Sequence, residues 1–186
     1  MLKLNLKEKA FDGKLILSDL QIEIKKGEIF HIIGESGIGK TTLMRILMGV
    51  DRDFEGEFEN NFSSMAATYP ERVFMGGISV LNEIKIFTSN SNAEIESAFE
   101  FLNMAEAKNK KASELSTGMR SRASIIRAML KDGDIVFLDE PLLGLDPMTK
   151  DLTIDFIKDH SRGKAIVYTG DQIFTNENRL CLRENN

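Results

Sequence analysis

Two segments of different character meet at the stretch Gly34-Glu35-Ser36-Gly37-Ile38-Gly39-Lys40-Thr41. Residues 28–33, just before it, read Glu-Ile-Phe-His-Ile-Ile and are nearly all apolar, as in a strand buried on both faces. Residues 40–48, which overlap its end, carry apolar side chains at helical spacing, and Gly49 follows as a stop. The sequence therefore predicts a glycine-rich loop between a buried strand and a helix.

This junction has the properties of an anion-binding loop. Its glycines allow positive φ and close approach of backbone N–H groups to an anion, and the helix start adds unpaired donors and a favourable dipole. The pattern GxxxxGK[ST] is complete, so we expect Lys40 to reach the β and γ phosphates of ATP in binding and catalysis, and Thr41 to be a ligand of Mg²⁺. The expected nucleotide-binding residues are Gly34, Glu35, Ser36, Gly37, Ile38, Gly39, Lys40, Thr41 and Thr42. The alternative is a flexible glycine turn before an ordinary helix.

Two carboxylates follow another buried run. Residues 135–138 read Ile-Val-Phe-Leu, and Asp139-Glu140-Pro141 come next. Carboxylates at this point lie at the carboxyl edge of a parallel sheet, where such sheets bind ligands. We expect Asp139 to hold Mg²⁺, directly or through water, and Glu140 to accept a proton from the attacking water. The alternative is a polar strand end without function.

The order of the remaining patterns predicts an α/β phosphate-loop NTPase fold. We expect a mostly parallel core sheet flanked by helices, an N-terminal antiparallel β part and a small helical subdomain. Within a single domain of residues 1–186, residues 1–70 and 112–186 form the expected nucleotide-binding core and residues 71–111 the helical subdomain. The expected helices are 40–48, 80–87, 93–102, 117–130 and 148–160, and the expected buried strands are 28–33, 135–138 and 165–168.

Composition narrows the function classes. The net charge of −5 offers no general attraction to nucleic acid, which argues against that partner. The single cysteine, Cys181, cannot form an internal disulfide, so the fold suits a reducing cytosol. Charged or glycine residues interrupt every apolar run before the roughly 20 residues that a membrane span needs.

A third motif identifies a family. The segment Glu114-Leu115-Ser116-Thr117-Gly118-Met119-Arg120 resembles the LSGGQ signature of ABC-type ATPases, and Gly144-Leu145-Asp146 is similar to the family's D-loop. The resemblance implies that Ser116 and Gly118 face the γ phosphate of an ATP held by a second ATPase domain, in a homodimer or heterodimer. On structural grounds alone, Ser116 is a helix cap. The resemblance also implies that Phe11 stacks on adenine, although a lone aromatic between strands is more often core.

Two positions depart from the family pattern. The family's switch histidine is replaced by Gly170 in Thr169-Gly170-Asp171, and Pro70 or Glu71 stands where a glutamine is expected. Gly170 has no side chain to contact a γ phosphate, so we expect slow hydrolysis. By position alone, Asp171 or Gln172 are candidates to replace the histidine in part, and the alternative for each is an ordinary loop role.

The resemblance implies an ATP-binding subunit that drives separate membrane-spanning transporter subunits. Such a protein is cytoplasmic and reaches the cytoplasmic face of a membrane only through those partners. One alternative is a nucleotide-responsive regulatory module that binds ATP with little hydrolysis. Another is a soluble ABC-type ATPase that acts on nucleic acid or ribosomes, against which the acidic charge argues.

Overall fold

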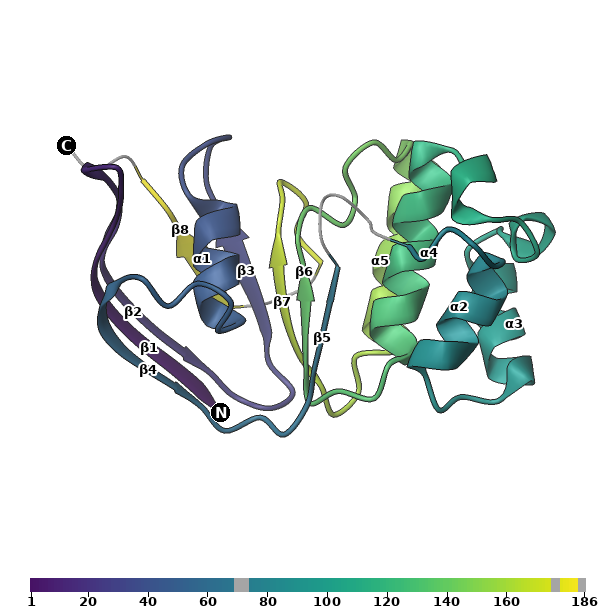
Figure 1. Ribbon diagram of the computed structural model, residues 1–186, viewed down its shortest axis with the longest axis horizontal. Helices are drawn as coiled ribbons and strands as arrows, with labels where there is room; N and C mark the ends of the chain where they lie inside the picture. Colours follow the sequence, from purple (N-terminus) through teal and green to yellow (C-terminus); the bar gives the residue numbers. More distant parts are fainter. Residues whose placement is uncertain (69–73, 175–177, 184–186) are drawn as a thin grey trace.

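The computed structural model describes residues 1–68, 74–174 and 178–183, in which the strands form two sheets (Figure 1). The strands are β1 (Leu2–Phe11), β2 (Lys14–Ile24), β3 (Ile29–Ile33), β4 (Glu55–Asn60), β5 (Met65–Thr68), β6 (Ile135–Leu138), β7 (Ala165–Thr169) and β8 (Asn178–Cys181). The α-helices are α1 (Lys40–Leu47), α2 (Val80–Phe87), α3 (Asn92–Phe101), α4 (Thr117–Leu130) and α5 (Pro147–Asp159), and two short 3₁₀ helices span Ala105–Ala107 and Ala112–Glu114.

The central sheet has the strand order β5-β6-β7-β3-β8, and all of its pairs are parallel. Every residue of β6 and β7 is buried, as expected for apolar strands covered on both faces. One face packs against α1, and the opposite face packs against α4 and α5. The α/β prediction with a mostly parallel core sheet is confirmed.

The second sheet is antiparallel and has the order β2-β1-β4. Leu2, Leu4 and Leu6 of β1 are fully or almost fully buried, while the residues between them are exposed, so one face of this sheet is in the core. Figure 1 shows α1 between this sheet and the parallel sheet. Helix α1, which follows the predicted phosphate loop (residues 34–41), is therefore enclosed on two sides, and this gives the loop a rigid base.

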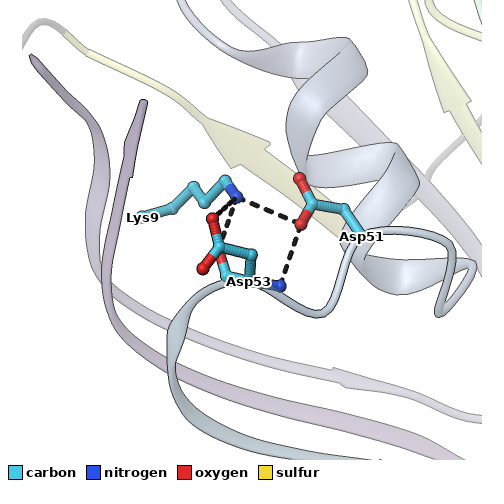
Figure 2. Close-up of polar contacts among 3 residues, drawn as sticks. All are labelled: Lys9, Asp51 and Asp53. Carbon is cyan, nitrogen blue, oxygen red and sulfur yellow. Dashed lines mark hydrogen bonds and ion pairs between the residues drawn. The ribbon is translucent and has the colours of Figure 1, made fainter. Parts of the chain in front are cut away.

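A buried lysine fastens the antiparallel sheet to the segment after α1. The Nζ atom of Lys9 lies 3.0 Å from Asp51 Oδ1 and 3.3 Å from Asp53 Oδ2, and it also donates to the backbone carbonyl of Asp53 (Figure 2). Burial by itself would lower the pKa of Lys9, but hydrogen bonds and the negative charges of both aspartates outweigh it, so the pKa lies above its ordinary value. A charged Lys9 thus joins β1 to the chain that leaves the phosphate-loop helix.

Helices α2 and α3 pack against α4 on the side remote from the antiparallel sheet (Figure 1). Ser79 caps α2, and Ser91 forms a capping box with Glu94 at the start of α3. The predicted helices 80–87 and 117–130 match α2 and α4, and the other three agree within one residue at each end. Among the helices of the described residues, none is long and apolar enough to cross a bilayer.

Three strands lie outside the sequence predictions. Strand β4 is acidic and mostly exposed, β5 is short and half alanine, and β8 is largely exposed at the edge of the parallel sheet. None has the alternating or continuous apolar pattern that indicates a strand. Their strand character comes from backbone pairing with β1, β6 and β3, which are distant in sequence.

Candidate nucleotide site

The phosphate loop has the conformation that its glycines permit. Gly37 and Gly39 have φ of 83° and 107°, values that side chains other than glycine rarely adopt. Gly39 is also the N-cap of α1 and makes no side-chain hydrogen bond to the first turn. The N–H groups at the start of α1 therefore point out of the helix without a side-chain acceptor from their cap, which is the arrangement that binds anions.

Lys40 folds back across this loop. Its Nζ atom donates to the carbonyl oxygens of Gly34 and Glu35, at 2.7 Å and 2.9 Å, and the residue is only 9% exposed. The ammonium group is therefore fixed over the loop backbone. Glu35, Ser36 and Gly37 form the exposed tip.

The structure brings Thr41 and Asp139 together, as expected for two ligands of one ion. Thr41 Oγ1 donates to Asp139 Oδ2 at 3.0 Å, although the two residues belong to α1 and to the end of β6. The second carboxylate oxygen, Oδ1, accepts from Thr169 Oγ1 at 2.7 Å. Asp139 is 5% exposed, so these two hydroxyl groups hold a buried carboxylate in one orientation.

Glu140 turns away from the direction of β6. Its φ of 44° lies in the left-handed region, which costs a non-glycine residue conformational energy and is often found at functional sites. The Glu140 amide donates to Thr169 Oγ1 at 2.8 Å, so Thr169 fixes both acids. Glu140 lines a pocket of about 210 Å³ together with Gly144, Lys150, Gly170 and other residues from the ends of β6 and β7.

The site's donor set fits a triphosphate with a divalent ion. The loop amides offer hydrogen-bond donors to phosphate oxygens, and Lys40 offers a positive charge. The oxygens of Thr41 and Asp139 are the hard ligands that Mg²⁺ prefers. These groups converge where the carboxyl end of β6 meets the start of α1. Thr42, at the next position of the helix, is partly buried.

The signature segment begins α4. Ser116 accepts a hydrogen bond from the Met119 amide at 3.2 Å, so it is the helix cap that the sequence indicates. A Cβ at Gly118 would lie 3.4 Å from the side chain of Leu145, which places the signature beside the D-loop-like segment. Within the described residues, neither Ser116 nor Gly118 hydrogen-bonds to the phosphate loop, and their role toward a second domain stays a prediction.

Phe11 ends β1 and is 67% exposed, so the alternative that it is a core residue is wrong. Its exposure leaves the ring face accessible, while stacking on adenine stays a prediction. Pro70 and Glu71, at the position of the expected glutamine, lie outside the described residues.

Sequence reasoning missed two features of this site. The sequence indicates Thr169 only as part of the segment Thr169-Gly170-Asp171, yet its hydroxyl contacts both Asp139 and the Glu140 amide. No motif indicated a role for His31, but its Nε2 lies 2.7 Å from the carbonyl oxygen of Gly170. The polar residue in an otherwise apolar strand was the available signal for His31.

Comparisons with known proteins agree with this geometry. The family model described as "ABC transporter" matches residues 17–143. The chain is 30% identical to the aliphatic sulfonates import ATP-binding protein SsuB 2 of Burkholderia cenocepacia, with 92% of this chain and 68% of that protein covered. It is 31% identical to the spermidine/putrescine import ATP-binding protein PotA of Fusobacterium nucleatum, with 88% and 49% covered. The chain thus spans about two thirds of one relative and half of the other.

Solved structures share the fold. An ABC transporter ATP-binding protein from Pyrococcus furiosus superposes with a TM-score of 0.85 at 23% identity, over 97% of this chain and 96% of that one. A dimeric ATP-binding cassette in a post-hydrolysis state, bound to ADP and Pi, gives a TM-score of 0.80 at 25% identity, over 98% and 94%. Together with the family match, these findings establish that the chain belongs to the ABC transporter family, as one of its ATP-binding ATPase domains.

Proposed function

We propose that this chain binds MgATP between the phosphate loop and the acidic end of β6 and hydrolyses it to drive a transporter. One observation carries the proposal: Thr41 Oγ1 and Asp139 Oδ2 lie 3.0 Å apart, so the two expected magnesium ligands meet across two elements. Glu140 follows directly in the chain, which puts a carboxylate next to the ion site to act as a general base.

Each residue has a distinct part in this reaction. Loop amides and Lys40 hold the phosphates, and Thr41 with Asp139 hold Mg²⁺, whose charge offsets that of the phosphates. Glu140 takes a proton from the water whose oxygen forms a bond to the γ phosphorus. The bond between that phosphorus and the bridging oxygen breaks, and the products are ADP and inorganic phosphate.

The proposed partners are a second ABC-type ATPase domain and separate membrane-spanning subunits. Ser116 and Gly118 of one domain would face the phosphates bound by the other, because the start of α4 presents backbone N–H groups at the surface. Relatives include import proteins and the Nod factor export ATP-binding protein I of Cupriavidus pinatubonensis, so their names support a transporter role without indicating a cargo.

The proposed location is the cytoplasmic face of a membrane, reached through the partner subunits. In the proposed division, residues 1–186 form a single domain in which residues 1–70 and 112–186 bind nucleotide. Residues 71–111 form the helical subdomain beside which the membrane subunits dock. The arrangement of α2 and α3 on the far side of α4 supports this division.

A second candidate function rests on Gly170. Because glycine has no side chain for the γ phosphate, the chain is alternatively a regulatory module that binds ATP and scarcely hydrolyses it. This module would respond to ATP by closing on an active partner domain.

Glu140→Gln separates the two functions. If Glu140 is the general base, the rate of phosphate release by the variant should fall by about a hundredfold or more. The variant should also accumulate an ATP-dependent dimer. Lys40→Ala is the binding control and should weaken ATP affinity in calorimetry, because it removes a cation from the phosphates. Equal and negligible hydrolysis by the wild type and Glu140→Gln would favour the module instead. Unchanged ATP affinity of Lys40→Ala would contradict the assignment of the phosphate loop.

A further inference from the structure

We propose that Lys150 supplies the positive charge beside the transferred phosphate where Gly170 has no side chain. The inference rests on the proposed ATP hydrolysis and adds a residue that no sequence motif indicated. Lys150 lies in the first turns of α5 and lines the same pocket as Glu140, Thr169 and Gly170.

The pocket adjoins the proposed phosphate site. Glu140 lines it directly, and Thr169, which also lines it, donates to Asp139 Oδ1. Asp139 in turn contacts Thr41 of the phosphate-loop helix. A cation in this pocket therefore acts next to the general base and the ion ligand.

The Gly170 backbone is held in place by buried groups. His31 Nε2 lies 2.7 Å from the Gly170 carbonyl oxygen, and the His31 ring stacks on Tyr168 with centroids 4.1 Å apart. Tyr168 stacks on Phe174 at 3.7 Å, and its hydroxyl accepts from the Phe174 amide at 3.1 Å. The segment between β7 and Phe174 is thereby fixed from both ends, so the pocket is preformed.

The backbone conformation at position 170 also disfavours any residue larger than glycine. Its φ of 130° is a conformation that L side chains rarely adopt, although a Cβ there would meet no atom within 4 Å. The space beside the backbone is therefore open, while the backbone itself disfavours a histidine. A positive charge in this space has to come from another element.

Lys150 meets that requirement. It is partly buried, and among the described residues none forms a hydrogen bond or ion pair with its ammonium group. Asp146 caps α5 by accepting from the amide and hydroxyl of Thr149, at 3.0 Å and 2.6 Å, so the base of the Lys150 side chain is fixed. A cation near a helix N-terminus is unfavourable toward the helix dipole, which argues against a role in stabilising α5.

The charge balance of the pocket favours the same role. Glu140 and Asp171 both line it, and phosphate transfer brings further negative charge toward them. A nearby ammonium lowers the energy of that charge most in the transition state, and it neither gains nor loses a proton.

The test compares Lys150→Met with the wild-type full-length chain. The substitution keeps most of the side chain and removes the charge, so kcat for phosphate release should fall by about tenfold or more. ATP affinity, measured by calorimetry with Lys150→Met added to Glu140→Gln, should stay within about twofold of Glu140→Gln alone. Lys150→Arg should retain most of the activity. Lys158→Met is the matched control, since it is a partly buried lysine in the last turn of the same helix, and it should leave kcat unchanged.

Either of two results would overturn this inference and leave the proposed ATPase function standing. In the first, the wild type hydrolyses ATP and Lys150→Met has the same kcat. In the second, kcat and ATP affinity fall by the same factor, which indicates that Lys150 attracts the nucleotide equally in the bound state and in the transition state. A wild-type chain that binds ATP without any hydrolysis would instead overturn the proposed ATPase function together with the inference.

Discussion

The hydroxyl group of Thr169 makes two hydrogen bonds at the candidate site. Its oxygen donates to Asp139 Oδ1 and accepts from the Glu140 amide, so one side chain orients the proposed ion ligand and the backbone of the proposed general base. The residue is 1% exposed, which means that water cannot readily replace either bond. Both acids consequently depend on β7 for their positions.

Thr169→Val tests this dependence. The substitution preserves shape but leaves a carboxylate oxygen and an amide without partners, so we expect a loss of about 1–3 kcal/mol in the free energy of unfolding. We also expect kcat to fall more than ATP affinity. Urea denaturation and phosphate release measure the two effects. Thr153→Val is the control, because buried Thr153 donates only to the Thr149 carbonyl within α5. Equal effects of the two variants would contradict the proposed role of Thr169.

At the same scale, the sequence predicted residues whose spacing has a chemical meaning. Gly34, Lys40 and Thr41 lie close together in the sequence, at the junction of one loop with α1, so the pattern alone indicates their shared site. The positions of Thr169 and Lys150 could not be predicted in this way, because each reaches the site from a different element. Their contribution depends on how β7 and α5 pack beside β6.

At the scale of elements, burial determined which segments were predictable. Strands β6 and β7 are continuous apolar runs because both faces are covered, and α2 and α4 begin at serine caps. Strand β4 carries three glutamates on an edge, where charge protects against unwanted pairing but removes the apolar pattern. Such a strand becomes visible only when its partner β1 is known.

An ion pair attaches α2 to α4. Arg127 Nη1 lies 2.6 Å from Glu83 Oε1, and Glu83 Oε2 accepts from the Met75 amide at 2.8 Å. The guanidinium also lies over the rings of Phe74 and Phe87, at 4.5 Å and 5.7 Å from their centroids. The Glu83 side chain is 2% exposed, so this carboxylate relies on Arg127 for its charge partner.

Arg127→Met should therefore destabilise the chain by about 3 kcal/mol, since it leaves a buried carboxylate without compensation. Adding Glu83→Gln should recover part of that loss, because the double variant has no buried charge to compensate. Urea denaturation of the single and double variants gives the coupling energy. Additive losses would indicate that Arg127 acts through packing on the aromatic rings and not through Glu83.

At the scale of the whole molecule, helix α1 packs between the two sheets. The parallel sheet contacts α1 on one side and the antiparallel sheet covers the other. A polar cluster of Lys9, Asp51 and Asp53 links the antiparallel sheet to the segment that follows α1 (Figure 2). Lys9 is 4% exposed, while Asp53 has a side chain that is 96% exposed. The cluster thus connects a buried cation to the surface beside the phosphate-loop helix.

The protonation of Lys9 makes this link testable by pH. Because its pKa is raised in the folded chain, its contribution to stability is complete below the pKa of an unfolded lysine, about 10.4, and is lost as the pH rises through the folded value. Lys9→Met should lower the free energy of unfolding by about 1–3 kcal/mol at neutral pH, because the two aspartates can still hydrogen-bond to water but lose a charged donor. That difference should stay constant from about pH 6 to 9 and shrink above about pH 10. Urea denaturation across this range measures it, with exposed Lys7→Met on the same strand as the control. A difference that already shrinks between pH 6 and 9 would mean that burial outweighs the aspartates and that Lys9 is neutral in the fold.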